Sequence, residues 1–438
     1  MKNRPKNKRK LRFDTLDAWL GWQLTLNPAE IDLGLDRVER VLGNAGLNNT
    51  FDCPLITVAG TNGKGSVVAM LESIAMAAGL RVGVYTSPHL LHYNERIRID
   101  GRAVTDADLC AAFDFIDSRR ADVALTYFEF GTLAAIKLFS SVSPDLVILE
   151  VGLGGRLDAV NVMQPDVAIV TAIDIDHTDW LGHDRETIGY EKAGIFRPGK
   201  AAICADASPP ASLLNHAAGI GARLWLSGRD YRFQAQRNGW LLQAGEADQQ
   251  TFVLPALAGD FQLANAAAAV LALRLALGDR VGSDAINDGL RNVSLAGRFQ
   301  MLRQRPEVIV DVAHNRQAVE SLATMLEARP CSGRTHAVIA MLADKPSEAV
   351  VRLLWPLVDS WYSAGLEGVP RGLSAQAMAQ AIHAVAVERP RPDVKLCAET
   401  TVAAACDRAV RAASAADRII VLGSFYTVAD AMRFFGIQ

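Results

Sequence analysis

The sequence predicts an α/β fold with two domains built on mainly parallel sheets. Its 438 residues exceed what one ordinary hydrophobic core accommodates. Short β-branched runs alternate with longer amphipathic runs through most of the chain, as in successive β-α-β units. A glycine-rich turn with a lysine follows the first of these runs and precedes a helical run. These features predict an N-terminal P-loop-type parallel-sheet domain and a smaller, Rossmann-like C-terminal α/β domain.

The first series of elements predicts the N-terminal domain. Strands are expected at residues 54–58, 81–85, 145–150 and 166–171, and helices at 67–78 and 264–276. A polar stretch at 174–184 follows the fourth strand. Residues 1–296 are therefore predicted to form the first domain together with a basic N-terminal arm.

A second series begins near Gly297 and predicts the C-terminal domain, residues 297–438. Strands are expected at 308–311, 336–340, 394–397 and 418–422, and helices at 375–387 and 400–413. The two series share no residue-level period, so no internal repeat is expected.

The composition is typical of a soluble globular protein, with 50% hydrophobic and 21% charged residues. No apolar run approaches the roughly 20 residues that a membrane-spanning helix needs. The six cysteines show neither a CxxC pair nor metal-ligand spacing, which favours a reducing compartment. We therefore expect a cytoplasmic protein without a membrane partner, and by default a monomer.

The first twelve residues, MKNRPKNKRKLR, are strongly basic. No apolar segment follows them, which argues against a signal peptide. A nucleic-acid-binding tail is one alternative. The net charge of −3 for the whole chain favours a solvated arm instead, so no nucleic-acid partner is expected.

A phosphate-binding loop is expected between the first strand and the first helix. Glycines let backbone N–H groups converge on phosphate oxygens, and the helix N-terminus adds partial positive charge. Lys64 supplies a mobile cation and Ser66 a hydroxyl for magnesium. The strict GxxxxGK[ST] pattern is not met, because Val58 stands at the first glycine position and a glycine follows the lysine. The predicted ATP-binding residues of this shortened loop are Gly60, Thr61, Asn62, Gly63, Lys64, Gly65 and Ser66.

Seven motifs follow one another along the chain. They are GTNGKGS at 60–66, YTSPHL at 85–90, LEVGLGGRLDA at 149–159, DHTDWLG at 176–182, EKAGIF at 191–196, GRFQ at 297–300 and DVAHN at 311–315. Together they resemble folylpolyglutamate synthases of the Mur ligase superfamily, most of all the bifunctional bacterial enzymes that also act as dihydrofolate synthase. The match runs from about Ile31 to Val428, nearly the whole chain.

The resemblance implies an ATP-dependent ligase with a C-terminal glutamate ligase domain. ATP activates a carboxylate as an acyl phosphate, and the amine of L-glutamate then attacks it to form an amide. The implied acceptors are dihydropteroate, which gives dihydrofolate, and tetrahydrofolate or its polyglutamates. ATP is a co-substrate, and Mg²⁺, expected as two ions, is the implied cofactor.

The resemblance implies that Ser66, Ser87, Glu150, His177 and Lys192 hold the magnesium ions. Glu150 ends an apolar strand, where an ionised carboxylate needs a metal or a salt bridge. Magnesium prefers oxygen ligands, so a core histidine is the alternative for His177, and Ser87 alternatively caps a turn. The family's lysine at the position of Lys192 is carbamylated, which requires an unprotonated amine; the alternative is a lysine that reaches the surface.

The resemblance also places Asn265 at the nucleotide base, Arg298 at the phosphates and Asp311 at the ribose. Arg298 lies just past the predicted domain boundary, so it reaches ATP when the domains close; an interdomain salt bridge is the alternative. His314 follows the strand of Asp311, at the carboxyl end where α/β sites open, and is expected near the γ-phosphate unless it is an ordinary loop histidine. The predicted catalytic residues are Lys64, Lys192 and His314.

Two segments match the pterin-binding regions of the bifunctional enzymes. Tyr127 or Phe128 could stack on a flat pterin ring, or each could pack in a helix core. The predicted substrate-binding residues are Asp32, Leu33, Gly34, Leu35, Thr126, Tyr127, Phe128, Glu129, Arg156 and Leu157.

The chain departs from the family at three positions: Phe261 replaces a histidine, Arg316 a proline and Tyr426 a histidine. Two other functions stay open, a Mur-superfamily ligase for cell-wall precursors and a regulatory P-loop NTPase. Gly65 and the 126–129 segment favour the folate enzyme over the first. The N-K-x-D element of guanine-specific switches is missing, because the one Asn-Lys pair lies in the basic arm.

Overall fold

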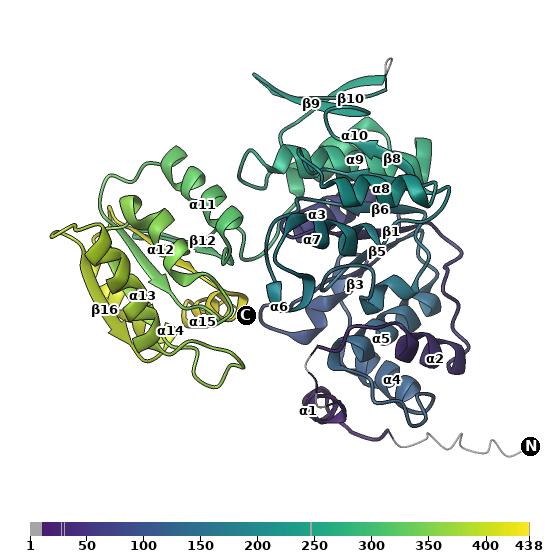
Figure 1. Ribbon diagram of the computed structural model, residues 1–438, viewed down its shortest axis with the longest axis horizontal. Coiled ribbons are helices and arrows are strands. Elements are labelled where there is room, and N and C mark those ends of the chain that lie inside the picture. The colour runs from purple at the N-terminus through teal and green to yellow at the C-terminus, as the bar shows by residue number, and fades with distance from the viewer. Residues whose placement is uncertain (1–10, 28, 30, 246–247, 438) are drawn as a thin grey trace, which may run out of the picture.

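The chain forms two α/β bodies, each around its own sheet, and Figure 1 shows them side by side with the smaller, C-terminal body in green to yellow. The computed structural model describes residues 11–27, 29, 31–245 and 248–437. Residues 1–10 of the predicted basic arm lie outside the described residues. Among the described residues, none of the helices has the length and apolar character that a membrane crossing requires.

The larger body contains an eight-stranded sheet in the order β4-β3-β2-β5-β1-β6-β7-β8. The six strands from β2 to β8 in this order run parallel, and β3 and β4 extend one edge antiparallel. The strands are β1 (Leu55–Ala59), β2 (Val82–Tyr85), β3 (Ile97–Ile99), β4 (Arg102–Ala103), β5 (Leu146–Glu150), β6 (Val167–Val170), β7 (Ala201–Cys204) and β8 (Arg223–Leu226). The central strands are buried along their whole length because helices cover both faces.

Helices pack on both faces of this sheet. Ile56 and Val58 of β1 face one layer, whereas Leu55 and Ala59 face the other. The first layer consists of α3 (Lys64–Ala77), α9 (Gln262–Leu277) and α10 (Ser283–Asn292). The second consists of α1 (Leu16–Leu26), α2 (Asp36–Asn44), α4 (Asp106–Asp117), α5 (Tyr127–Val142), α7 (Arg185–Ala193) and α8 (Ala211–Gly219). Short elements are η1 (Tyr93–Arg96), η2 (Ala159–Val162), α6 (Thr178–Leu181) and η3 (Gly278–Arg280).

A separate antiparallel sheet projects from the larger body at the top of Figure 1. It consists of β9 (Tyr231–Gln236), β10 (Gly239–Ala244) and β11 (Asp248–Phe252). Trp240 and Phe252 are buried from this sheet into the core that α9 shares, which fixes its position. The sequence analysis did not predict this sheet.

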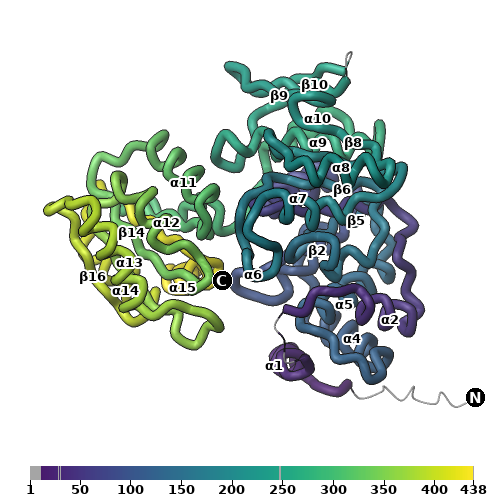
Figure 2. Tube along the Cα trace, in the orientation of Figure 1, coloured from purple at the N-terminus to yellow at the C-terminus, as the bar shows by residue number. Residues whose placement is uncertain are grey.

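The smaller body contains a six-stranded sheet in the order β12-β13-β17-β14-β15-β16, parallel except for β12. The strands are β12 (Gln300–Gln304), β13 (Glu307–Asp311), β14 (Thr335–Ile339), β15 (Ser360–Ala364), β16 (Lys395–Glu399) and β17 (Arg418–Leu422). The helical elements are α11 (Arg316–Ala328), α12 (Ser347–Leu354), η4 (Trp355–Leu357), α13 (Ala375–Glu388), α14 (Val402–Ala412) and α15 (Phe425–Phe434). α11, α12 and α13 cover one face, and α14 and α15 the other; the tube in Figure 2 traces the path of the chain through them.

The predicted fold class is confirmed. Every strand expected from the sequence is present, and its ends differ by at most two residues from the expectation. The helix expected at 67–78 is α3. It starts at Lys64, three residues earlier than expected, because the left-handed Gly63 (φ 93°) ends the loop directly before it. The boundary at residues 296 and 297 falls between α10 and β12, and we keep it as a proposal.

Candidate active site

The glycine-rich loop connects the carboxyl end of β1 to α3. Gly60 and Gly63 both have positive φ angles, 151° and 93°. A side chain at Gly60 would overlap the hydroxyl of Thr171, and one at Gly63 would come within 2.7 Å of the side-chain oxygen of Asn265. Thr61 N–H donates to the carbonyl of Ala172 at 2.8 Å, which holds the loop against the end of β6. The two glycines are therefore required by close contacts on both sides of the loop.

The side chain of Lys64 folds back over this loop. Its Nζ donates to the carbonyls of Gly60 at 2.9 Å and Thr61 at 3.3 Å. Burial lowers the pKa of the Lys64 ammonium, while the negative charges of Glu150 and Asp176 oppose this change. The cation is thus held at the mouth of the loop without a direct ion pair in the described part of the chain.

Ser66 at the start of α3 is linked to α9 by a chain of hydrogen bonds. Gln262 Nε2 donates to Ser66 Oγ at 3.3 Å, and Asn265 Nδ2 donates to Gln262 Oε1 at 2.9 Å. All three side chains are buried. The departure at Phe261, which is 41% exposed, leaves these contacts of its neighbours intact.

Two predicted metal ligands meet at the carboxyl edge of the sheet. Glu150 ends β5 and is 4% exposed, and Ser87 follows the neighbouring strand β2. The backbone N–H of Ser87 donates to Glu150 Oε2 at 3.2 Å. Burial raises the pKa of Glu150, and Lys64 opposes that increase. A buried carboxylate with a single backbone donor retains acceptor sites for a cation.

His177 and Lys192 line a small cavity of about 20 Å³ together with Lys64 and Asp176. Lys192 is 3% exposed, and its ammonium makes no hydrogen bond or ion pair within the described residues. Burial, followed by the charge of Lys64, lowers the pKa of Lys192 to about 7. Burial also lowers the pKa of His177 to about 4, so its ring is neutral near pH 7 and able to bind a metal.

Within the described residues, no three His, Cys, Asp or Glu side chains gather into a metal-binding group. The predicted set instead combines one carboxylate, one imidazole, two hydroxyls and one lysine. Magnesium usually takes one or two carboxylates and completes its shell with water and substrate phosphate oxygens. The residues therefore fit a magnesium site that is completed by the nucleotide.

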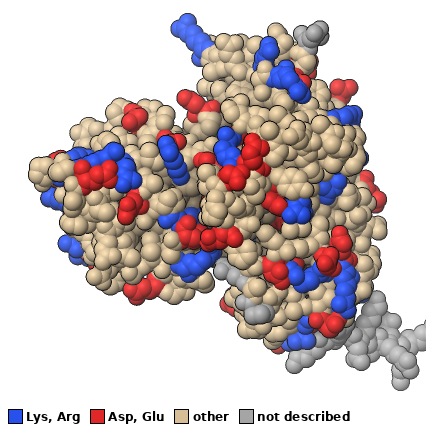
Figure 3. Space-filling model, in the orientation of Figure 1, with Lys and Arg blue, Asp and Glu red and all other residues tan. Residues whose placement is uncertain are grey.

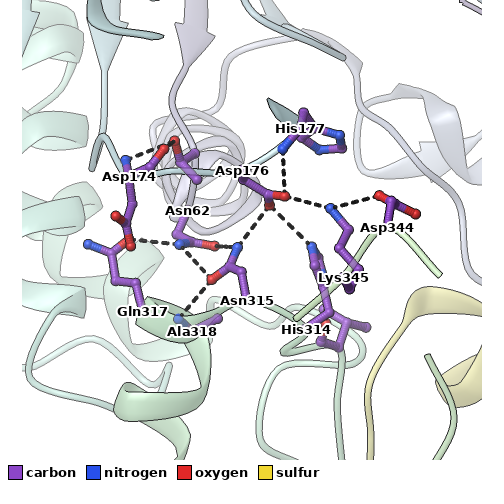
Figure 4. Close-up of polar contacts among 12 residues, drawn as sticks. Asn62, Asp174, Asp176, His177, His314, Asn315, Gln317, Ala318, Asp344 and Lys345 are labelled. Carbon is purple, nitrogen blue, oxygen red and sulfur yellow. Dashed lines mark hydrogen bonds and ion pairs between the residues drawn. The ribbon is translucent and has the colours of Figure 1, made fainter. Parts of the chain in front are cut away.

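Asp176 connects the larger body to the smaller one (Figure 4). Its carboxylate accepts hydrogen bonds from Lys345 Nζ at 2.6 Å and Asn315 Nδ2 at 3.0 Å, and it lies 3.6 Å from His314 Nε2. Asn315 also exchanges hydrogen bonds with Asn62 of the phosphate loop, at 3.1 and 3.2 Å. Figure 3 shows charged side chains of both signs along the seam between the two bodies.

The contacts at this seam determine the ionisation of Asp176 and the position of the proton on His314. Burial alone would raise the pKa of Asp176, but the nearby His314 side chain and the positive charges around the carboxylate hold the pKa well below its usual value. His314 Nδ1 lies 2.8 Å from the carbonyl of Val312, which identifies Nδ1 as the protonated nitrogen. His314 therefore faces the larger body through Nε2.

Arg298 and Asp311 lie on the C-terminal side of the seam. Asp311 ends β13, and its two oxygens accept hydrogen bonds from the N–H groups of Phe299 and Ala313, both at 2.8 Å. The guanidinium of Arg298 lies over the ring of Phe425 at 5.4 Å. Arg298 lines a cavity of about 850 Å³ that begins beside the loop, with Gly65, Ser87, Glu150 and Phe425 among the other lining residues.

The predicted substrate segments meet on the face of the larger sheet that α2 and α5 cover. Arg37, which the sequence analysis did not select, joins Asp32 at 2.8 Å to Glu129 at 3.0 Å. Gly34 N–H donates to the carbonyl of Leu157 at 3.1 Å. Leu33 and Leu35 are half-buried in the same segment. Residues 32–35, 129 and 157 therefore form one contiguous region, although they are far apart in sequence.

Four of the remaining predicted substrate residues make contacts within the protein. Thr126 and Glu129 cap the N-terminus of α5 by exchanging hydrogen bonds with each other's backbone N–H groups. Phe128 covers Gly152, where an added side chain would come within 2.6 Å of the ring. Arg156 pairs with Glu191 at 2.7 Å.

Several residues of the site received no role from the sequence. Asp176 and Asn315 lie in two of the seven motifs, directly beside His177 and His314. That position was the sequence feature that could have indicated a role for them in the site. Asp158 also stood in a motif; burial raises its pKa to about 7, and it accepts the backbone N–H of Leu153 at 2.8 Å. Lys345 carried no signal, because its partner Asp176 is 169 residues away.

The two-body architecture and a phosphate loop facing a second α/β body define the Mur ligase class. Residues 58–273 match the Mur ligase middle domain, and residues 297–425 match the Mur ligase glutamate ligase domain. A dihydrofolate synthase/folylpolyglutamate synthase of Escherichia coli is 44% identical over 419 residues, covering 95% of this chain and 94% of the relative. The chain belongs to the dihydrofolate synthase/folylpolyglutamate synthase family of Mur ligases.

Solved structures of the family match the whole chain. Escherichia coli FolC in complex with DHPP and ADP has a TM-score of 0.89 and 43% identity, covering 97% of this chain and 98% of that one. A bifunctional folylpolyglutamate synthase/dihydrofolate synthase with Mn, AMPPNP and L-glutamate bound has a TM-score of 0.87 and 43% identity, with 97% and 98% covered. The first of these relatives therefore binds DHPP and ADP, and the second binds Mn, AMPPNP and L-glutamate.

Proposed function

We propose that the protein adds L-glutamate to dihydropteroate, forming dihydrofolate, and to tetrahydrofolate or its polyglutamates, at the expense of ATP. The observation that carries this proposal is the meeting of a phosphate loop with Glu150, His177 and Lys192 at a seam whose other side presents Arg298 and His314. The bound ligands named for the solved relatives support it. The scattered free thiols support a cytoplasmic location.

ATP binds with its phosphates on the loop of residues 60–66 and its nucleoside in the adjoining cavity. Lys64 and Arg298 neutralise the phosphate charge from opposite sides of the seam. Asp311 lies beside Arg298 and serves the ribose, while Asn265 supports the loop at Gly63. A nucleotide contacted by both bodies is enclosed when the bodies dock.

Ser66, Ser87, Glu150, His177 and Lys192 hold two magnesium ions. When bound, these ions polarise the phosphoryl oxygens and neutralise the charge that develops on them. Lys192 contributes as a carbamate: its buried amine has no hydrogen-bond or ion-pair partner among the described residues and lies in the same small cavity as His177. Carbamylation would add carbon dioxide to the neutral amine, with loss of a proton, and place an anion next to the ammonium of Lys64.

The acceptor lies along the Asp32, Gly34, Phe128 and Leu157 region, with its carboxylate directed toward the phosphate loop. The carboxylate oxygen forms a bond to the γ-phosphorus, and ADP leaves. The amine of L-glutamate then bonds to the acyl carbon, the C–O bond to phosphate breaks, and the amine loses a proton. His314, held by the Val312 carbonyl, is placed beside the transferred phosphoryl group.

The test is product formation by the purified protein with each acceptor. Amide product from dihydropteroate and from tetrahydrofolate is expected, and each reaction should require ATP, magnesium and L-glutamate. Cell-wall precursors should give no product, and phosphate release without an acceptor should be slow. Turnover with a cell-wall precursor alone, or acceptor-independent hydrolysis at the full rate, would replace the folate assignment with one of the two alternative functions.

A further inference from the structure

Arg96 is a deeply buried arginine without a carboxylate partner in the described part of the chain. It ends η1 and is 9% exposed. Its Nε donates to His89 Nδ1 at 2.9 Å, and its guanidinium lies over the rings of Tyr93 and Tyr127, with its carbon at 5.2 and 5.6 Å from their centroids. Arginines buried to this extent are normally paired with a carboxylate. The described residues therefore provide no ion pair for the positive charge of Arg96.

Two other arginines of the larger body, Arg98 and Arg37, show the usual arrangement. Arg98, two residues along, binds Glu72 through Nε and Nη2, with a shortest distance of 2.7 Å. Arg37 on the substrate side binds Glu129 at 3.0 Å. These residues stabilise their own surroundings through ion pairs, whereas Arg96 has neutral partners only among the described residues.

The surroundings of Arg96 hold its guanidinium in place and leave it accessible. The two tyrosine rings provide flat contact surfaces but no negative charge. None of the Arg96 nitrogens is both sealed from solvent and without a hydrogen-bond partner. The N–H groups of Arg96 that have no partner among the described residues therefore reach solvent.

Arg96 lies between the aromatic substrate region and the carboxylate-activating site. Its carbonyl accepts the N–H of Thr86 at 2.8 Å, and the next residue, Ser87, donates its N–H to Glu150. On the other side Tyr127, which stacks on Arg96, directly precedes Phe128 of the substrate region. An acceptor that extends from Phe128 to the phosphate loop passes this guanidinium.

We propose that Arg96 binds a carboxylate of the acceptor that does not react, the α-carboxylate of the terminal glutamate of a reduced folate. The inference rests on the proposed function. In such an acceptor the α-carboxylate belongs to the same residue as the reacting γ-carboxylate, whereas dihydropteroate carries its reacting carboxylate alone. The planar fork of arginine matches a carboxylate with two parallel hydrogen bonds. Arg96 is thus a specificity-determining residue that acts on one acceptor and not on the other.

The test compares both acceptors in the wild type and in R96Q and R96K. R96Q should raise the KM for tetrahydrofolate about ten- to a hundredfold, as expected for the loss of hydrogen bonds to a charged group. The KM for dihydropteroate should change less than about twofold, and kcat with dihydropteroate should be retained. R96K keeps the charge without the fork, so its KM for tetrahydrofolate should lie between those of the wild type and R96Q.

The matched control is R119Q, which removes an arginine stacked on Phe115 at 3.8 Å on α4 and its C-terminal turn. It should change neither KM, and thermal melting of all variants monitors folding. An equal rise in KM for both acceptors, or unchanged KM for tetrahydrofolate in R96Q and R96K, overturns the assignment of Arg96. If the wild type uses neither acceptor, the proposed function fails, and this inference fails with it. If the wild type is active and the Arg96 variants keep its KM for tetrahydrofolate, only the assignment of Arg96 fails.

Discussion

Replacing Lys192 with methionine should stabilise the metal-free protein and abolish ligase turnover. The lysine is 3% exposed and has no hydrogen-bond or ion-pair partner in the described residues, so below its pKa the folded chain bears a buried cation without a direct partner. Methionine has a similar length and no charge, and it fits an apolar site without a polar partner. Turnover should be lost because the site loses the residue that we propose as a carbamate.

The magnitude follows from the pKa of Lys192, which burial lowers to about 7. A lysine in an unfolded chain has a pKa near 10.4, and each pH unit between the two values corresponds to about 1.4 kcal/mol. The upper limit of the stabilisation by methionine is therefore about 5 kcal/mol. Between pH 7 and pH 10 the unfolded chain binds a proton that the folded chain lacks, so the stability of the wild type rises with pH.

The assay is urea unfolding at pH 6 and pH 9 in carbon dioxide-depleted buffer with a chelator. Relative to K192M, the wild type should gain about 3 kcal/mol of unfolding free energy between these pH values. K200M is the matched control, since Lys200 is 49% exposed and pairs with Asp166 at the surface; its difference from the wild type should be small at both pH values. A stability difference between K192M and the wild type that is the same at pH 6 and pH 9 would refute the reasoning.

Three further predictions concern the loop, the seam and the substrate region. Lys64→Ala should fold, by circular dichroism, but lose turnover by about a hundredfold or more, because the phosphate charge is no longer neutralised; near-normal turnover would contradict the loop assignment. Asn315→Ala removes hydrogen bonds across the seam and also the N-cap of α11, so it should lower kcat about tenfold and lower the melting temperature by several degrees, whereas the solvent-exposed Arg316→Ala, in the first turn of the same helix, should change neither. Asp32→Ala and Phe128→Ala should reduce dihydrofolate synthesis more than glutamate addition to tetrahydrofolate; unchanged rates in both steady-state assays would argue against the pterin assignment of these residues.

Much of the fold was predictable because its strands are short, apolar and β-branched. The parallel strands that carry Glu150 and Asp311 stand out in the sequence, since burial on both faces leaves no polar alternation to confuse them. The phosphate loop was predictable for a similar reason, because its strand, glycines and helix are contiguous. Elements whose structure depends on neighbouring residues in the sequence, such as these strands and this loop, were therefore predicted.

Elements and contacts that depend on distant partners were not predicted. β15 has the sequence SWYSA, whose serines are buried by the strands on either side and give no apolar run. The outer strands β9 and β11 of the small antiparallel sheet are mostly exposed and give no apolar run. Arg37 and Lys345 carry charges that are common on helix surfaces and in loops. Their roles arise from partners 92 and 169 residues away, which no local pattern contains.

Asp176 shows why docking of the two bodies and assembly of the site are a single event. A carboxylate as buried as this one is costly unless counter-charges surround it. Of its partners, Lys345, Asn315 and His314 all come from the C-terminal body, and His177 follows it in the chain. Separation of the bodies removes these three partners together and also withdraws Arg298 and Asp311 from the phosphate loop. The pKa of Asp176 is low only in the docked arrangement, so the charge that orders the seam and the groups that bind the nucleotide are established by the same movement.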